Sequence, residues 1–483
     1  MDENILLLLV GSVLAFSVFV ALMATKIGVP SLVAFLILGM ALGTEAFGDF
    51  AFYDIHLART IGIIALVLIL FEGGLSTSWR RLRHVAIPAV LLSTIGVVVT
   101  AGLTALLVKN LFDLSWVESL LFGAVVSSTD AAAVFASLRF TKLKVKLART
   151  LEAETGVNDP MAIALTIGLI SWLENPDHSI SSFAWLLTGQ MGWGLLMGAL
   201  LGLICIRIFS HLPKSVGSFA PVASLAACAL TYGITASVGG SGFLAVYLVG
   251  LAIGSTPSRY RQHLVAFHEG IAFLSQVILF IVLGVLIAPE ELKSVAIPSL
   301  IIAVVLILII RPIAAFVSLS ITNYGLREKL FIGLAGLRGA VPIVLGTFVL
   351  SSESLDSRFT IFNAVFFIVL VSAVLQGVTV NRLAKLLSLE ESDIDDGKPD
   401  KKRVSKNIMY EFLVEADHSI KGAKVKEVGL PKTAILASVK RAGKKRTAKK
   451  EMVLRRGDIL FVIANENLAE DIYDVFARWR RRV

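Results

Sequence analysis

Charged residues and cysteine are scarce in this chain of 483 residues. Asp, Glu, Lys and Arg make up 17% of it and cysteine occurs 2 times, whereas 56% of the residues are hydrophobic and the mean hydropathy is +0.81. A single soluble domain of this length would not be so apolar, so the composition predicts an integral membrane protein. Two cysteines make no disulfide framework, and Cys205 and Cys228 are expected to be small packing residues in apolar stretches.

Several motifs are also missing. No phosphate-binding loop ends in Gly-Lys-Ser/Thr, which disfavours an ATP-driven pump. No carbonyl filter such as Thr-Val-Gly-Tyr-Gly is present, which disfavours a ligand-gated cation channel. The first apolar run has no basic flank and no small-residue cleavage site, so we expect it to be a retained helix rather than a signal peptide. No cofactor and no nucleic-acid partner is expected.

Thirteen apolar stretches have about the length that spans ~30 Å of hydrocarbon. They lie at 5–24, 30–45, 59–75, 85–108, 116–137, 148–172, 183–208, 219–237, 241–256, 267–288, 295–321, 328–350 and 360–386. The predicted fold is therefore an all-α polytopic membrane domain over residues 1–388, followed by a charged linker at 389–403 and a small α/β domain at 404–483.

The loops between these stretches alternate in charge. The basic loops contain Arg80, Arg81 and Arg83; Lys142, Lys144, Lys146 and Arg149; Arg207 and Lys214; Arg259 and Arg261; and Arg327 and Lys329. The opposite loops contain Asp49 and Asp54; Glu174 and Asp177; Glu290 and Glu291; and Glu353 and Asp356. By the positive-inside rule, the basic side faces the cytoplasm of a cell (inner) membrane protein. An odd number of spans then leaves the N-terminus outside and the C-terminal domain cytoplasmic.

Polar residues interrupt two of the predicted spans. An ionised side chain at such depth costs about 3 kcal/mol or more, so acids kept there usually bind or relay ions. On a helix at 100° per residue, Thr155 and Asp159 share one face, and Glu154 and Asn158 share the neighbouring face. A hydroxyl and a carboxylate provide the hard oxygen ligands that a dehydrated alkali cation prefers.

The other interruption is Ser127-Ser128-Thr129-Asp130, and a Gly/Pro-rich segment, residues 336–342, breaks a span in the second half. Broken helices are tolerated at membrane depth where they are buried or line a cavity, and their free carbonyls can coordinate an ion. One broken span in each half predicts inverted repeats with a binding site near the bilayer midplane.

Arg338 lies nine residues past Lys329, about 13 Å along a helix, which is too deep for its charge to reach water easily. We expect Glu154 to be its counter-charge, in a structural ion pair. Asn158 is expected to bond the broken backbone near Thr129, although an ordinary packing amide is the alternative.

Three further residues are open to two interpretations. Glu72 is expected either at the membrane interface or in the access funnel of the ion. His268 and His84 lie at predicted cytoplasmic edges, where a solvated histidine is ordinary, so neither is expected to be the main pH switch.

Asp130 and Asp159 imitate the acid pair of an intramembrane protease, but that chemistry has no use for Asn158.

The motifs together resemble the NhaP-type monovalent cation:proton antiporters of the cation:proton antiporter 1 family. They are Phe71-Glu72-Gly73-Gly74, Ser128-Thr129-Asp130-Ala131, Glu154-Thr155-Gly156-Val157-Asn158-Asp159-Pro160 and Gly336-Leu337-Arg338-Gly339-Ala340-Val341-Pro342. The resemblance implies a transporter rather than an enzyme, with K⁺ or Na⁺ bound by Asp159, Asp130, Thr129 and Thr155, and with Ser128 shaping the site. It also implies a homodimer. Family members often carry Ser at position 155, so the Thr adds a methyl group beside the ion.

The tail resembles a TrkA-C lobe, the C-terminal part of potassium-conductance regulators. Its charge differs from that of the membrane part, because residues 389–483 hold 22 of the 45 Lys and Arg. No Gly-x-Gly-x-x-Gly fold precedes it, so the NAD-binding half is expected to be absent. A basic hairpin around 440–450 has two interpretations, a site for a small phosphorylated ligand or a loop beside anionic membrane lipid.

The expected activity is electroneutral, one-for-one exchange of a monovalent cation for H⁺. Oxygen ligands alone do not separate K⁺ from Na⁺, but antiporters with a TrkA-C lobe tend to be linked to K⁺, so K⁺ leads narrowly over Na⁺ or Li⁺. Such exchange serves cation and pH homeostasis.

Overall fold

The computed structural model describes residues 3–27, 31–43, 54–138, 143–175, 179–211, 219–256, 260–287 and 289–390, and in the tail 407–414, 420, 422–431, 434–441, 444–465, 472, 475, 476 and 479. It divides into two compact units, Met1–Ser392 and Asp393–Val483. Most of the predicted linker lies outside the described residues.

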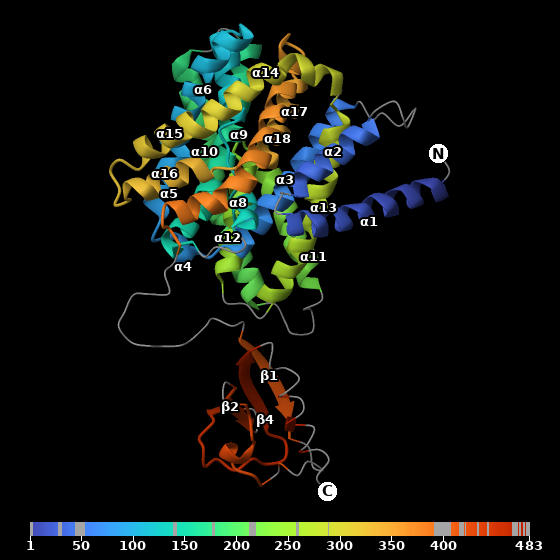
Figure 1. Ribbon diagram of the computed structural model, residues 1–483, viewed down its shortest axis with the longest axis vertical. Coiled ribbons are helices and arrows are strands. Elements are labelled where there is room, and N and C mark those ends of the chain that lie inside the picture. The colour runs from blue at the N-terminus through green and yellow to red at the C-terminus, as the bar shows by residue number, and fades with distance from the viewer. Residues whose placement is uncertain are drawn as a thin grey trace. The chain divides into compact units, whose positions relative to one another are not determined.

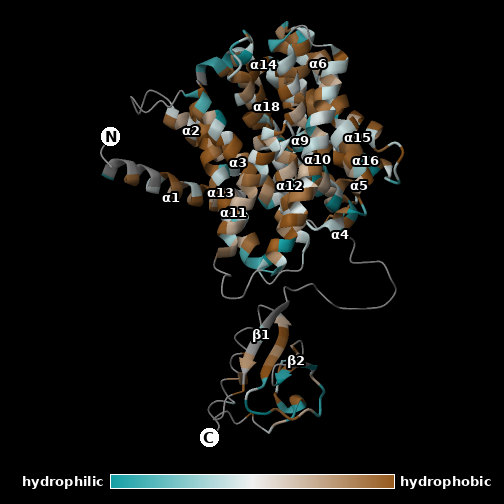
Figure 2. Ribbon diagram, turned by 180° about the vertical axis from the view of Figure 1, so that it is seen from behind, coloured by the Kyte–Doolittle hydropathy of each residue, from teal (hydrophilic) through white to brown (hydrophobic). Residues whose placement is uncertain are grey.

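The first unit is a helical bundle (Figure 1). Its helices are α1 (Glu3–Ile27), α2 (Ser31–Gly43), α3 (Ile55–Ser76), α4 (Trp79–Leu82), α5 (Ala86–Leu91), α6 (Val97–Phe112), α7 (Trp116–Val125), α8 (Ala131–Ser137), α9 (Val145–Glu174), α10 (Ile180–His211), α11 (Ala220–Ser237), α12 (Gly242–Ser255), α13 (Arg261–Val285), α14 (Pro289–Val305), α15 (Arg311–Ser318), α16 (Leu326–Ala335), α17 (Ala340–Leu350) and α18 (Arg358–Leu386). Figure 2 shows hydrophobic colour along the helices and hydrophilic colour gathered toward the ends of the bundle.

Among the described residues, eight helices are long and apolar enough to cross a membrane, or nine if the bent pair α16 and α17 counts as one span. Four of the predicted spans correspond to shorter apolar helices, Gly11–Met23, Ser31–Gly43, Trp116–Val125 and Gly242–Ser255. The polytopic, all-α membrane architecture is therefore confirmed, whereas the number thirteen stays a prediction.

Both predicted broken helices are present, and they meet. The chain is non-helical between α7 and α8 and again between α16 and α17, where the two helices differ in direction by 50°. The Asp130 N–H of the first break donates to the Leu337 carbonyl of the second at 2.8 Å. Each half also contains a π-helical segment before its broken helix, Leu92–Gly96 and Leu306–Ile310. The two halves therefore repeat the same irregularities, as inverted repeats require.

Glycines let α12 and α3 pack with their backbones in contact. A side chain at Gly74 would meet the Tyr247 carbonyl, and one at Gly254 would meet the Leu75 carbonyl. Gly73 has open space around it instead. The second glycine of the Phe-Glu-Gly-Gly motif is thus a packing residue, and the first leaves room beside Glu72.

Some of the loops predicted to share a side are in contact among the described residues. At the basic end, Lys146 Nζ donates to the Asn323 carbonyl at 2.6 Å, and the Lys144 N–H donates to the Leu389 carbonyl at 3.1 Å. At the acidic end, Ser352 Oγ donates to Glu174 at 2.9 Å. These contacts agree with the predicted sides of the loops that they join.

The second unit contains a four-stranded antiparallel sheet in the order β1-β4-β2-β3. Its strands are β1 (Asn407–Leu413), β2 (Ile435–Arg441), β3 (Lys444–Thr447) and β4 (Ile459–Asn465), with a 3-10 helix at Val425–Glu427. The predicted basic hairpin is the pair β2 and β3.

Candidate functional site

A cavity of about 420 Å³ lies between α3, α9, α12 and the two breaks. Its walls include Glu72, Gly73, Ser76, Thr77, Ser128, Thr129, Asp130, Glu152, Thr155, Gly156, Asp159, Tyr247, Gln276 and Gly339. All four residues predicted to bind the cation, Asp159, Asp130, Thr129 and Thr155, line it together with Ser128 and Glu72. The structure therefore brings the predicted ligands to one cavity.

Asp159 is the acid set deepest into α9. Its side chain is 5% exposed, and its Oδ1 has no hydrogen-bond partner among the described residues. Thr155, one turn earlier, accepts the Ala131 N–H at 3.1 Å. Since a hydroxyl has two lone pairs, Thr155 keeps one for a further partner. An unpartnered carboxylate oxygen and a hydroxyl on one helix face match a site for a cation or a proton.

Asp130 comes from the break rather than from a regular helix. It caps α8, and its Oδ1 accepts the Ala133 N–H at 3.1 Å. A side chain at Gly339 would meet the Asp130 carboxyl group, so this position in the second break requires glycine. The crossing of the two breaks thus holds Asp130 at the cavity wall.

Asn158 lies on the neighbouring face of α9 and is fully buried. Its Nδ2 donates to Thr129 Oγ1 at 3.0 Å. Asn158 therefore contacts the break at Thr129, as expected, but the predicted bond to the backbone is wrong, because the bond goes to the Thr129 side chain. Asn158 therefore orients a predicted ligand.

The predicted ion pair between Glu154 and Arg338 is wrong. Glu154 instead pairs with Arg311 of α15, at 2.7 Å between Oε1 and Nη2, and both side chains are at most 2% exposed. Arg338 donates to the carbonyls of Ser127, at 2.8 Å, and Ser128. The break leaves these carbonyls without helical partners, so they are available to Arg338.

This exchange of partners changes the charge balance near the cavity. Arg311 neutralises Glu154, whereas the Nε and Nη2 of Arg338 have no partner among the described residues. Arg338 is therefore a positive charge held in the first break by two backbone carbonyls. Sequence reasoning missed Arg311, although an arginine inside the apolar stretch 295–321 was a visible signal.

Two cavity residues were also missed. Glu152 accepts a hydrogen bond from Thr77 at 3.0 Å, near Glu72, which accepts one from Ser76 at 2.6 Å. Tyr247 is 4% exposed, and its hydroxyl has no partner among the described residues. Its ring occupies the space that a side chain at Gly156 would need. Helical periodicity in α12 gave no indication that this tyrosine faces a polar cavity.

The expected solvation of His268 is wrong as well. It is 0% exposed, its Nε2 lies 2.8 Å from Ser224 Oγ, and its ring packs on Phe71 at a centroid distance of 4.8 Å. Because α13 already begins at Arg261, His268 lies about 10 Å along the helix rather than at its end. His84 is exposed, as expected.

A membrane bundle with two broken helices crossing beside buried acids is a secondary ion transporter. The family described as "Sodium/hydrogen exchanger, transmembrane" matches residues 13–386, and the family described as "TrkA-C domain" matches residues 409–477. The chain belongs to the sodium/hydrogen exchanger family, whose members are cation:proton antiporters and not enzymes.

Two relatives of known name match nearly the whole chain, and a solved structure matches most of it. The K(+)/H(+) antiporter NhaP of Alkalimonas amylolytica is 36% identical, covering 98% of this chain and 83% of the relative. The K(+)/H(+) antiporter NhaP2 of Shewanella sp. (strain MR-4) is 33% identical, covering 97% and 83%. The structure of the sodium proton antiporter MjNhaP1 from Methanocaldococcus jannaschii shares the fold, with a TM-score of 0.72 and 24% identity over 80% of this chain and 99% of its own.

Proposed function

We propose that this protein exchanges K⁺ for H⁺ across the cell (inner) membrane, and that the two ions compete for Asp159 with Asp130 as the second acid. The observation that carries the proposal is the unpartnered Oδ1 of Asp159 in a cavity that Asp130, Thr129 and Thr155 also line. The two hydroxyls and the otherwise unpartnered Tyr247 hydroxyl supply further oxygens to a dehydrated cation.

The charge balance supports one-for-one exchange. Arg311 neutralises Glu154, and Arg338 is held in the first break by the carbonyls of Ser127 and Ser128. We take its positive charge to offset one of the two acids Asp130 and Asp159. One K⁺ or one proton then balances the remaining charge of Asp130 and Asp159. An empty site keeps an uncompensated charge, and moving that charge through the membrane interior is expensive. The binding site therefore changes its accessibility from one side of the membrane to the other only when it holds a cation or a proton. This condition enforces electroneutral antiport.

The share of the chain that each relative matches favours K⁺. The two relatives named K(+)/H(+) antiporters match 97–98% of the chain, tail included, whereas the structure named a sodium proton antiporter matches 80% of it. Exchange of Na⁺ or Li⁺ is the alternative. Purified protein in proteoliposomes should dissipate an imposed pH gradient on addition of K⁺, tested beside Na⁺, Li⁺ and Rb⁺. No dissipation with any of the four would contradict antiport, and a stronger response to Na⁺ would reverse the ion assignment.

The proposal extends to the orientation and the assembly. The bond from Lys144 to Leu389 ties the end of α18 to the basic end of the bundle, which supports a cytoplasmic tail and an N-terminus outside. Helix α1 exposes large apolar side chains, among them Leu7 at 71%, Leu8 at 72% and Phe19 at 56%. We propose that lipid and a second copy in a homodimer cover this surface.

The tail is proposed to regulate transport, because none of the cavity residues belongs to it. Arg441 of the basic hairpin is held by Asp458 at 2.6 Å, whereas Lys440, Arg446 and Lys449 are exposed. The exposed members are available to a small phosphorylated ligand or to anionic lipid. A chain ending at Glu390 should still exchange ions, with a changed dependence on pH or ion concentration. A dead truncation would make the tail part of the transport machinery, and identical profiles would remove its regulatory role.

A further inference from the structure

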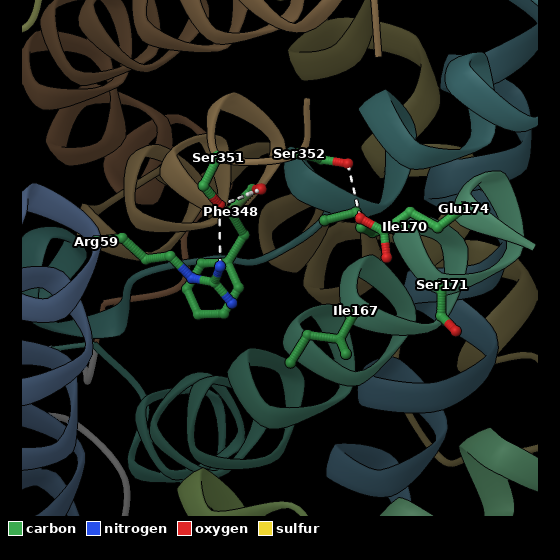
Figure 3. A pocket seen from close by; sticks show the side chains of 8 residues that line it. All are labelled: Arg59, Ile167, Ile170, Ser171, Glu174, Phe348, Ser351 and Ser352. Carbon is green, nitrogen blue, oxygen red and sulfur yellow. Dashed lines mark hydrogen bonds between the residues drawn. The ribbon is translucent and has the colours of Figure 1, made fainter. Parts of the chain in front are cut away.

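A second cavity, of about 210 Å³, lies at the other end of the same helices (Figure 3). It is lined by Arg59, Ile167, Ile170, Ser171, Glu174, Phe348, Ser351 and Ser352. On α3, Arg59 precedes Thr77 of the large cavity by eighteen residues, about 27 Å along the axis. The two cavities therefore open toward opposite ends of the bundle, and this one belongs to the acidic end.

Helix α9 connects the two cavities along one face. Ile170 follows Asp159 by eleven residues, which at 100° per residue returns to within about 20° of the same direction. Thr166, seven residues after Asp159, lies on this face too. It is 0% exposed, and its hydroxyl has no partner among the described residues. A buried threonine in a helix usually bonds a carbonyl one turn back, as Thr150 does with Lys146 at 2.8 Å. Thr166 is therefore an available oxygen between the two cavities.

The second cavity combines oxygen ligands with one positive charge. Glu174 accepts a hydrogen bond from Ser352 at 2.9 Å. Arg59 Nη1 donates to Ser351 Oγ at 3.0 Å, and its guanidinium lies 4.4 Å from the centroid of the Phe348 ring. Figure 3 shows Arg59 reaching over Phe348 toward Ser351. A cation entering here meets the guanidinium charge, so this conformation repels the ion that the carboxylate and hydroxyls would bind.

We propose that this cavity is the outer vestibule of the ion path, a transient site for a monovalent cation on Glu174 and the hydroxyls of Ser171 and Ser352. Arg59 is the latch that closes it while Asp159 faces the large cavity. This assignment rests on the antiport function proposed above. Opening requires the guanidinium to leave Ser351 and Phe348, and the cation then moves between the vestibule and Asp159 past Thr166.

Transport from the two faces of the membrane tests the cation site. In right-side-out vesicles, Glu174→Gln should raise the half-saturating K⁺ concentration about fivefold, because the carboxylate that concentrates the cation is lost. Arg59→Gln should lower it, and neither variant should change it in everted vesicles. Glu353→Gln and Lys293→Gln, exposed charges at the same end outside the cavity, are the matched controls. Equal shifts on both faces, or shifts no larger than those of the controls, would overturn the vestibule.

Labelling tests the latch without any transport. Ser171→Cys in the full-length purified protein should react with a membrane-impermeant thiol reagent, and K⁺ should slow the reaction. Cys205 and Cys228 are buried, so the parent protein gives the background. Adding Arg59→Gln should accelerate labelling severalfold; an unchanged rate would refute the latch. Absence of cation-dependent proton flux in the unsubstituted protein would instead contradict antiport, while labelling would still decide whether Arg59 closes the cavity.

Discussion

Glu154 and Asp159 are buried acids only five residues apart on α9, yet they lie on different faces of this helix and have different surroundings. Glu154 is 1% exposed and is bound by Arg311 at 2.7 Å. Asp159 is 5% exposed and lines the cavity with an unpartnered Oδ1. Removing one member of a buried ion pair leaves the other uncompensated, so Glu154 is tied to Arg311. Asp159 has no such partner and is available to exchange one cation for another.

The difference teaches that depth in the membrane does not by itself mark an acid as a transport residue. On the function proposed above, the nearest fixed cation decides the role of each acid. Glu154 forms an ion pair with Arg311 of α15. Arg338 instead donates to backbone carbonyls of the first break. Four predictions test this comparison, beginning with the one that should have the largest effect.

Replacing Asp159 should abolish transport and leave the fold intact. Asp159→Asn keeps the shape of the side chain but removes the group that takes up a cation or a proton, so cation-dependent proton flux should fall to the background of empty liposomes. The yield and the elution volume of the purified protein should not change. Asp356→Asn, an exposed acid that lines neither cavity, is the control. Retention of more than a small fraction of the flux would contradict the assignment of Asp159.

The pair on the other face should affect stability instead. Truncating Glu154 or Arg311 alone should destabilise the membrane domain by about 3–5 kcal/mol, because each leaves an orphaned buried charge. The double variant Glu154→Met with Arg311→Met should recover part of that loss in a thermal unfolding assay. In a double-mutant cycle that combines Glu154→Met with Arg338→Met, the two losses of stability should be close to additive. If the Arg338 cycle showed the stronger coupling, the assignment of Glu154 to Arg311 would be wrong.

The sequence predicts the faces of α9 and the two breaks because both follow from local rules. Helical periodicity places Thr155 with Asp159, and glycine, proline and clustered polar residues interrupt a helix wherever they occur. The partner of Glu154 does not follow from such rules. It depends on how α15 is rotated against α9, and on carbonyls that become available to Arg338 only once the break has formed.

The positions of Tyr247 and His268 were unpredictable for the same reason. Each lies on an apolar helix where any of several faces can turn inward, and the choice is made by backbone contacts of glycines such as Gly74 against a neighbouring helix. The burial of His268 depends in addition on where α13 begins. Packing between distant segments, rather than local propensity, therefore completes the site.

Tyr247 should affect ion binding less than the acids do. Tyr247→Phe removes only the unpartnered hydroxyl, so the half-saturating K⁺ concentration should rise about fivefold, which corresponds to ~1 kcal/mol. The maximal rate should be retained. Tyr324→Phe is the control, because that hydroxyl lies 2.6 Å from Thr150 and outside the cavity, so its loss should lower stability alone. Identical half-saturation in Tyr247→Phe and the unsubstituted protein would exclude the phenol as an ion ligand.

The smallest effect on transport is expected from a change in the tail, where Asp458 repeats the arrangement of Glu154 close to water. Burial tends to raise the pKa of Asp458, but the hydrogen bonds from Arg441 and the Arg455 N–H, with their charges, outweigh it and lower the pKa. A lowered pKa in the folded state contributes stability above the unfolded value of about 3.9, and this contribution is lost as the pH falls through the folded value. Asp458→Asn in the full-length protein should therefore weaken the lobe by ~2 kcal/mol at neutral pH.

Hydrogen exchange of β1 and β4 measures this effect. Protection of both strands should fall in Asp458→Asn at neutral pH, and the difference from the unsubstituted protein should shrink below about pH 4, where the unfolded carboxyl group also takes up a proton. Glu451→Gln is the control, because Glu451 binds Lys424 and Lys426 at the surface, where ion pairs contribute little. A difference that stays constant across this pH range would show that the shape of the side chain, rather than its charge, holds Arg441. In that case the pair of Asp458 and Arg441 would resemble the buried pair of Glu154 and Arg311 in geometry but not in electrostatics.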